Sequence, residues 1–370
     1  MNLPLSSNLP IECLAASFSN VTNSYKFYWF LAILEHLREH QSRIMSVDDL
    51  LTRMVAGVWY PAHYFRLSFG KQDQLGTIAL ELATQGRLTT ESRRAEILQV
   101  VRDDLAQKTA VGRKIRHLGD YVPYRFLRPF FALQLRGVKD WKINPAVETL
   151  AEQSFSTSNA PCLYRFIQQP PPAIEIHPAW FEYLHEHLAI LSGFCLWHLL
   201  NYLQRNNPNV PNIAGKLFEP QERDLRLART FWNTVLVQGG PLNCIYSGQP
   251  IQEDFSLDHF LPWRFVTHDQ LWNLIPTPRT VNLSKSDALP DLAYFDPFAQ
   301  LHYQAVQIIS RTPQAGRLLE DYVLLFKASD VADFQTMELS PFRETLRQTI
   351  APQLQIAANM GFMTGWKYTP

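Results

Sequence analysis

Apolar residues recur three and four positions apart through most of the first 205 residues, with polar residues between them. This spacing places the apolar side chains on one face of an α-helix. The segment from Tyr25 to Leu37 is an example. Only two short segments there, 163–167 and 173–177, are rich in the aromatic and β-branched residues that favour strands. The pattern predicts a mainly α protein.

The most apolar segment is 187–204, which contains no Asp, Glu, Lys or Arg. Its length approaches the roughly 20 residues that span a bilayer. Because it includes Ser192, His198 and Asn201, we expect a helix in a helical core and no membrane partner. The N-terminus lacks the basic segment of a signal peptide. We therefore expect a cytoplasmic protein.

A chain of 370 residues is long enough for two domains, and the segment 206–220, with three prolines and a glycine, interrupts the helical pattern. We predict a helical N-terminal domain over 1–205, which serves in docking or regulation. A linker and helix over 206–240 follow it. A small module over 241–290 and a helical C-terminal extension over 291–370 complete the chain.

Charge is balanced overall but uneven along the chain. Lys plus Arg and Asp plus Glu each number 34, so no global field attracts a polyanion. From 87 to 142, however, 13 Lys or Arg stand against 6 Asp or Glu, with Arg113, Lys114 and Arg116 at the densest point. Aromatic residues alternate with the cations just after it, as phosphate contact and base stacking require. A solvated helix face followed by core aromatics explains the same segment, and both interpretations stay open.

The segment 243–290 concentrates residues that can carry chemistry. An extended segment at 255–257 delivers Asp258 and His259 side by side, and a short strand at 244–246 precedes it across a Ser-Gly-Gln-Pro turn. We predict that these two strands pair as a hairpin.

A helical turn over 269–272 then ends at Asn273. A helix from about 278 to 287 carries Asn282 and Lys285, which are three residues apart and so lie on one side.

The motifs DHFLPW, WNLIP and NLSKSDALP occur in this order. With their spacing, the segment resembles the HNH endonuclease family, in which two strands and one helix hold a single divalent metal. It is most similar to the HNH domain of CRISPR effector nucleases. The resemblance covers about 50 residues and implies a small ββα-metal module embedded in a helical C-terminal lobe.

The resemblance also implies roles for individual residues. Asp258 corresponds to the metal-binding carboxylate, His259 to the general base, Asn273 to the residue that braces the loop, and Asn282 to the second metal ligand. A neutral imidazole can take a proton from water at physiological pH, and a hard cation stabilises the leaving oxygen. Lys285 or Arg279 can hold a phosphate.

Two departures from the family pattern bear on the metal. Many members brace the hairpin with a zinc between two CxxC pairs, whereas here Cys244 stands alone and Ser247 takes its partner's place. We therefore expect no structural zinc. Where many members have a final histidine this chain has Asn282, which favours Mg²⁺ or Mn²⁺ over softer ions.

These features predict an HNH endonuclease that hydrolyses phosphodiester bonds in DNA and leaves a 5′-phosphate, with RNA as an open alternative substrate. The other interpretation is a catalytically silent HNH fold that binds nucleic acid or protein. A large helical partner domain without a P-loop suggests a nuclease of anti-phage defence or of a mobile element, held in check until a trigger arrives, with a regulatory protein or a homo-oligomer as its partner.

Overall fold

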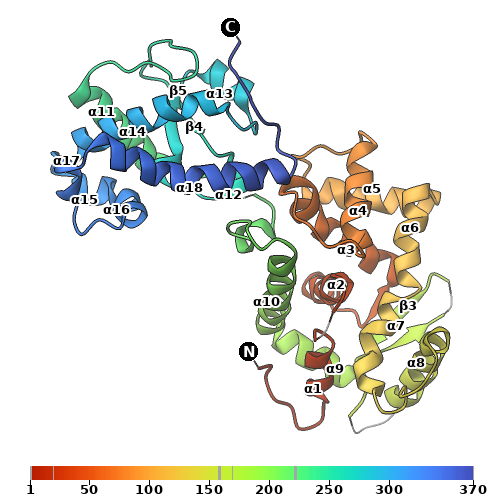
Figure 1. The fold of residues 1–370 in the computed structure, drawn as a ribbon. Helices are drawn as coiled ribbons and strands as arrows, with labels where there is room; N and C mark the ends of the chain where they lie inside the picture. The colour runs from red at the N-terminus through yellow and green to blue at the C-terminus, as the bar shows by residue number, and fades with distance from the viewer. Residues whose placement is uncertain (1, 20, 157–159, 169, 221–222, 370) are drawn as a thin grey trace. The chain divides into compact units, whose positions relative to one another are not determined.

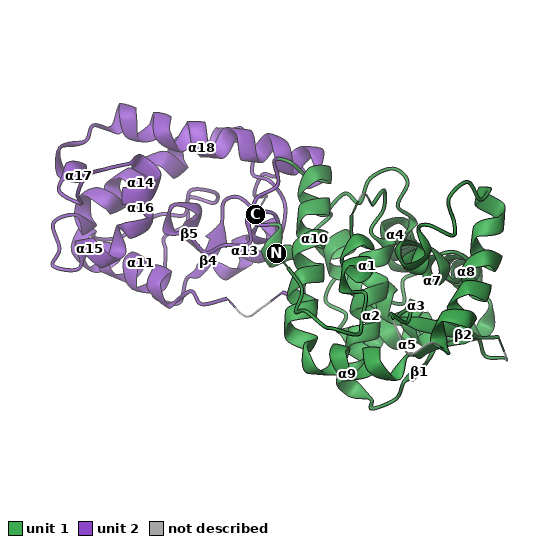
Figure 2. Ribbon diagram, turned by 90° about the horizontal axis from the view of Figure 1, so that it is seen from below, with its two compact units in different colours: residues 1–208, 213–219 green, residues 209–212, 220–370 purple. Residues whose placement is uncertain are grey.

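The computed structural model describes residues 2–19, 21–156, 160–168, 170–220 and 223–369. The chain forms two compact units (Figure 2): unit 1 comprises 1–208 and 213–219, and unit 2 comprises 209–212 and 220–370. Helices dominate each unit and the sheets are small (Figure 1), so the prediction of a mainly α fold is confirmed.

Unit 1 is built from helices and one small sheet. Its elements are α1 (Ile11–Ala16), α2 (Tyr25–Glu39), β1 (Ile44–Ser46), α3 (Val47–Trp59), η1 (Tyr60–Tyr64), α4 (Gln74–Thr84), α5 (Arg94–Gln107), α6 (Ala110–Gly119), α7 (Val122–Leu127), η2 (Arg128–Phe131), α8 (Asp140–Phe155), β2 (Tyr164–Ile167), β3 (Ala173–Ile176), α9 (Pro178–Glu186), α10 (Leu188–Asn206) and η3 (Ala214–Lys216).

Helix α3 forms the centre of unit 1 and packs against α2, α4, α5 and α6. Most of its side chains are buried, including Leu50, Met54 and Trp59. A helix that is buried nearly all round has to be enclosed by others. This explains why the surrounding helices need only one apolar face each.

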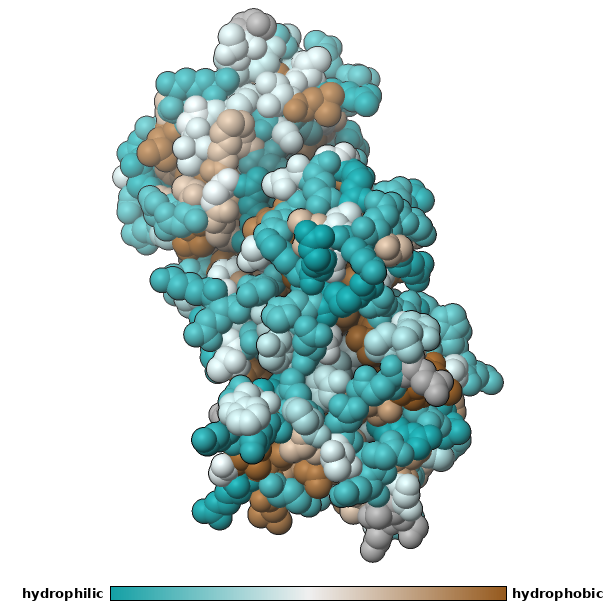
Figure 3. Space-filling model, turned by 90° about the vertical axis from the view of Figure 1, so that its right-hand side faces the viewer, coloured by the Kyte–Doolittle hydropathy of each residue, from teal (hydrophilic) through white to brown (hydrophobic). Residues whose placement is uncertain are grey.

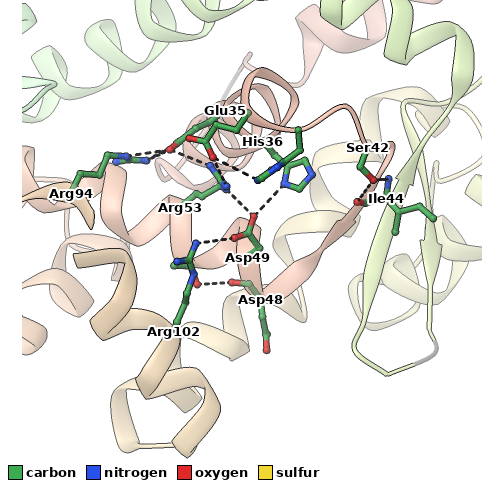
Figure 4. A network of polar contacts seen from close by, with 12 residues as sticks. Glu35, His36, Ser42, Ile44, Asp48, Asp49, Arg53, Arg94 and Arg102 are labelled. Atoms are coloured by element: carbon green, nitrogen blue, oxygen red, sulfur yellow. Dashed lines mark hydrogen bonds and ion pairs between the residues drawn. The ribbon is translucent and has the colours of Figure 1, made fainter. Parts of the chain in front are cut away.

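A network of charged side chains joins α2, α3 and α5 (Figure 4). Arg53, which is buried on α3, donates from Nε to Asp49 Oδ2 at 2.8 Å, and its Nη1 lies 3.3 Å from Glu35 Oε1 on α2. From α5, Arg94 donates to Glu35 and Arg102 lies 3.5 Å from Asp49. Arg94 and Arg102, two of the cations between 87 and 142, therefore form ion pairs within unit 1.

The three-stranded sheet has the order β1-β3-β2, with both pairs antiparallel. Its strands β2 and β3 lie within the segments 163–167 and 173–177, so the prediction of strands there is confirmed.

All of the apolar segment 187–204 except its first residue lies in α10, whose buried face includes Leu191, Phe194 and Leu203. Its other face is open, since Ile190 and Trp197 are half exposed. Among the residues that the structure describes, no helix is both long and apolar enough to cross a membrane. Hydrophilic residues cover most of the face drawn in Figure 3, and hydrophobic ones lie in scattered patches.

Unit 2 consists of helices around a two-stranded ribbon. Its elements are α11 (Arg226–Gly239), β4 (Ser256–His259), α12 (Trp263–Val266), η4 (Leu271–Asn273), β5 (Leu274–Thr277), α13 (Arg279–Lys285), η5 (Leu292–Tyr294), α14 (Phe295–Ile309), α15 (Ala315–Leu318), α16 (Glu320–Phe326), α17 (Asp333–Thr336) and α18 (Leu339–Asn359).

The core of unit 2 forms where α14 packs against α11 and α18. Helix α11 also contacts β5, and Trp232 Nε1 donates to the carbonyl of Leu274 at 2.9 Å. The ribbon is thus anchored to the helical core by a buried hydrogen bond, which fixes the place of the residues it carries.

Candidate nuclease site

The ribbon pairs β4 with β5 in antiparallel register, with Asp258 opposite Ile275 and His259 opposite Leu274. The prediction that 244–246 pairs with 255–257 is therefore wrong. Residues 243–250 instead close on themselves, because Gly248, with a φ of 69°, lets its N–H reach the carbonyl of Cys244 at 2.8 Å. That tight loop leaves no extended segment for β4.

Asp258 is buried, and both of its carboxylate oxygens have partners. Tyr246 donates its hydroxyl to Oδ2 at 2.9 Å, and Lys285 Nζ lies 3.1 Å from Oδ1. Burial, and next the Asp258 carboxylate, raise the pKa of Tyr246 well above its usual value, so its hydroxyl stays protonated and donates. The charge of Asp258 is thus neutralised within the unit.

His259 follows Asp258 on the strand, and successive strand side chains point to opposite faces. Its Nε2 lies 2.7 Å from Oδ1 of Asp269, in the loop between α12 and η4. Since a carboxylate accepts and does not donate, Nε2 carries the proton of this hydrogen bond, and in a neutral imidazole Nδ1 is then the acceptor. The contact therefore selects both the tautomer and the ring orientation.

Asn273 is fully buried at the end of η4 and spans the loop that follows β4. Its Oδ1 accepts from the N–H of Leu261 at 2.8 Å, and its Nδ2 donates to the carbonyl of the same residue at 3.0 Å. Its own carbonyl accepts from the N–H of Phe260 at 2.9 Å. Three hydrogen bonds thus fix the backbone just after His259.

Asn282 and Lys285 lie on α13, which packs against β4. Asn282 is half-buried, and its Nδ2 lies 3.5 Å from the carbonyl of Leu257, one residue before Asp258. Lys285 is only 1 % exposed and donates to the carbonyl of His259 at 2.6 Å in addition to its contact with Asp258. Its ammonium is directed into the site and away from solvent.

The other predicted substrate contacts are placed differently. Arg279 is exposed at the start of α13. Arg113, Lys114 and Arg116 lie on α6 in unit 1, and all three are engaged there. Arg113 donates to the carbonyl of Lys108, whereas Lys114 and Arg116 form ion pairs with acidic side chains at 2.5 and 2.7 Å.

The donor set of the site suits a hard cation. Asp258 on β4 and Asn282 on α13, two elements in contact, carry carboxylate and amide oxygens, the ligand types that Mg²⁺ prefers. Within the described residues there is no cluster of three or more His, Cys, Asp or Glu that could hold a metal ion. Two protein oxygens are still enough for Mg²⁺, which keeps several waters.

Two residues of the site escaped the sequence analysis, Tyr246 and Asp269. Asp269 stands 10 residues after the histidine that it contacts, in a segment predicted only as a helical turn. The contact arises because the loop folds back onto β4. Spacing along the sequence carries no signal for such a contact.

A strand pair that carries a buried Asp-His pair, followed by a short helix, forms a ββα arrangement. The model of the HNH endonuclease family matches residues 244–291, which supports membership of this segment in that family. No curated protein and no solved structure matches the chain. The family match suggests a nuclease and hydrolase that acts on nucleic acid.

Proposed function

We propose that this chain is a metal-dependent endonuclease that hydrolyses phosphodiester bonds in DNA. One observation supports the proposal: within the segment that matches the HNH family, β4 carries Asp258 and His259, and α13, which packs against β4, carries Asn282. These residues supply a carboxylate, a base and an amide oxygen. Together they meet the needs of phosphodiester hydrolysis.

His259 acts as the general base. With Nε2–H held by Asp269, Nδ1 takes a proton from water while the water oxygen forms a bond to phosphorus and the bond to the 3′ oxygen breaks. The leaving oxygen is then protonated, which gives a 3′-hydroxyl and a 5′-phosphate. Asp269 is a positioning residue, and Asn273 fixes the backbone that carries the imidazole.

Asp258 and Asn282 would hold Mg²⁺ or Mn²⁺, which neutralises charge on the phosphate and the leaving oxygen. Lys285 keeps the buried carboxylate of Asp258 neutralised in the cation's absence. Lys285 is thus placed to support a metal ligand, and the phosphate contact expected of it falls to Arg279, which is exposed on the same helix.

Docking of DNA has two candidate surfaces. The first is Arg113, Lys114 and Arg116 on α6, whose internal contacts leave them less free to meet phosphates. The second is Arg279, and we favour it. The dependence of log affinity on log salt should flatten by about 0.9 for each lost duplex contact, so Arg279→Gln and the triple Gln variant of α6 separate the two surfaces.

The deciding experiment incubates the purified chain with plasmid DNA and Mg²⁺, alongside His259→Ala protein and an EDTA control. We expect nicking or linearisation that requires both His259 and the metal. If His259-dependent cleavage occurs on neither DNA nor RNA, the proposed enzymatic function is rejected. The alternative of a catalytically silent HNH fold that binds nucleic acid or protein would then be favoured. We further propose a role in anti-phage defence, with a regulatory protein or a homo-oligomer as the partner.

A further inference from the structure

Unit 1 contains a cavity of about 540 Å³ at the start of α2, bordered by α6, α7 and the start of α8. Its volume lies within the range of roughly 300–1,000 Å³ that is typical of small-molecule sites. The residues that give it chemical character are Tyr25, Lys26, His117, Tyr121, Arg125 and Arg128, with Asp140 at its edge.

The cavity carries more positive than negative charge, since Lys26, Arg125 and Arg128 line it together with Asp140. Asp140 is used by Arg125, whose Nη1 lies 2.6 Å from Oδ1. Among the described residues of the cavity, Arg125 is the cation that forms an ion pair with Asp140, and the charge of Arg128 acts on Asp140 from beyond ion-pair distance. Burial, together with the charges of Arg128 and Arg125, lowers the pKa of Lys26 to about 8. These observations indicate that a bound anion would stabilise the positive charges of the cavity.

Aromatic rings stand beside these cations. Tyr121 is 48 % exposed, and its ring packs edge-on against His117 with centroids 5.1 Å apart. Tyr25 is held through its hydroxyl, which accepts from the N–H of Gln74 at 2.8 Å. An exposed ring in a cavity that also holds these cations suits a ligand that combines a planar group with a phosphate.

We propose that this cavity binds a nucleotide, with its phosphate between Lys26 and Arg128 and its base against the ring of Tyr121. Two cations in a recess suit one phosphate ester better than a polymer, which needs a row of contacts along a surface. The inference does not depend on nuclease activity, because all the residues concerned belong to unit 1.

The experiment measures binding to the full chain by isothermal titration calorimetry, with AMP, adenosine and inorganic phosphate as separate probes. We expect AMP to bind at least tenfold more tightly than either fragment, because only AMP meets both the cations and the ring. The same titration with GMP, CMP and UMP covers the other bases.

Lys26→Met and Arg128→Gln should each weaken AMP binding at least tenfold, whereas Arg136→Gln, an exposed cation outside the cavity, should leave it unchanged. Lys26→Arg keeps the charge and should retain binding, which guards against misfolding of the Met variant. The proposal is overturned if no nucleotide binds in the millimolar range. It also fails if only a single-stranded oligonucleotide binds, or if the Met and Gln variants bind as the wild type does.

Discussion

Replacing Lys285 by Met is the most direct perturbation of the candidate site, because the side chain is buried and contacts two of its groups. Its ammonium lies 3.1 Å from Asp258 Oδ1 and 2.6 Å from the carbonyl of His259. The paired side chains are 0 % and 2 % exposed, so solvent screens this ion pair little. Met keeps the length of the side chain and removes the charge.

The expected loss of stability follows from the carboxylate that is left behind. Breaking a buried ion pair by removing one partner costs about 3–5 kcal/mol, because the remaining charge is uncompensated. For a unit of this size, each kcal/mol lowers Tm by roughly 2–4 °C. Lys285→Met should therefore lower the Tm of the transition that unfolds unit 2 by roughly 6–20 °C.

Differential scanning fluorimetry, with and without Mg²⁺, measures this effect. The double variant Asp258→Asn/Lys285→Met removes both charges and should recover much of the loss, whereas Lys327→Met, at an exposed lysine of the same unit, should change little. Because Lys285→Met leaves the carboxylate of Asp258 free for a cation, Mg²⁺ should raise the Tm of this single variant more than that of the wild type. A Tm unchanged by Lys285→Met would refute this account of the buried pair.

Further predictions concern the loop, the metal ligand, the positioning residue and the core. Asn273→Ala should lower stability by about 2–4 kcal/mol in urea denaturation and also reduce cleavage, because it leaves two buried backbone groups unsatisfied; unchanged melting would argue against bracing. Asn282→Ala should abolish cleavage and Mg²⁺ binding in calorimetry while Tm is kept, and cleavage at the wild-type rate would reject it as a ligand. Asp269→Ala should lower kcat with little change in KM and shift the ¹⁵N resonances of His259 towards a mixture of tautomers, and an unchanged tautomer would exclude positioning. Burial lowers the pKa of His302 to about 3, so the unfolded state takes up its proton first and stability falls as pH drops below about 6.5; His302→Gln should flatten this loss in denaturant titrations between about pH 6.5 and pH 4, and an equal loss in both proteins would contradict it.

Local pattern in the sequence determines a large part of this protein. Helical periodicity predicts the mainly α fold, because apolar residues three and four positions apart share one face of a helix and this spacing can be read from the sequence. The order of motifs likewise identifies the segment that matches the HNH family. The adjacency of Asp258 and His259, and the short helix that carries Asn282, are local features of this kind.

Only the tertiary structure decides which distant groups meet. The strand partner of β4 is Leu274–Thr277 and not 244–246, because the backbone of the nearer segment closes into a tight loop. The contact of Asp269 with His259, and the burial of Lys285, depend equally on how loops and helices pack. Similarly, Lys114 and Arg116 form ion pairs with acidic side chains on other helices of unit 1. Charge in a sequence shows how many cations a segment has, but packing determines which of them remain free for a ligand.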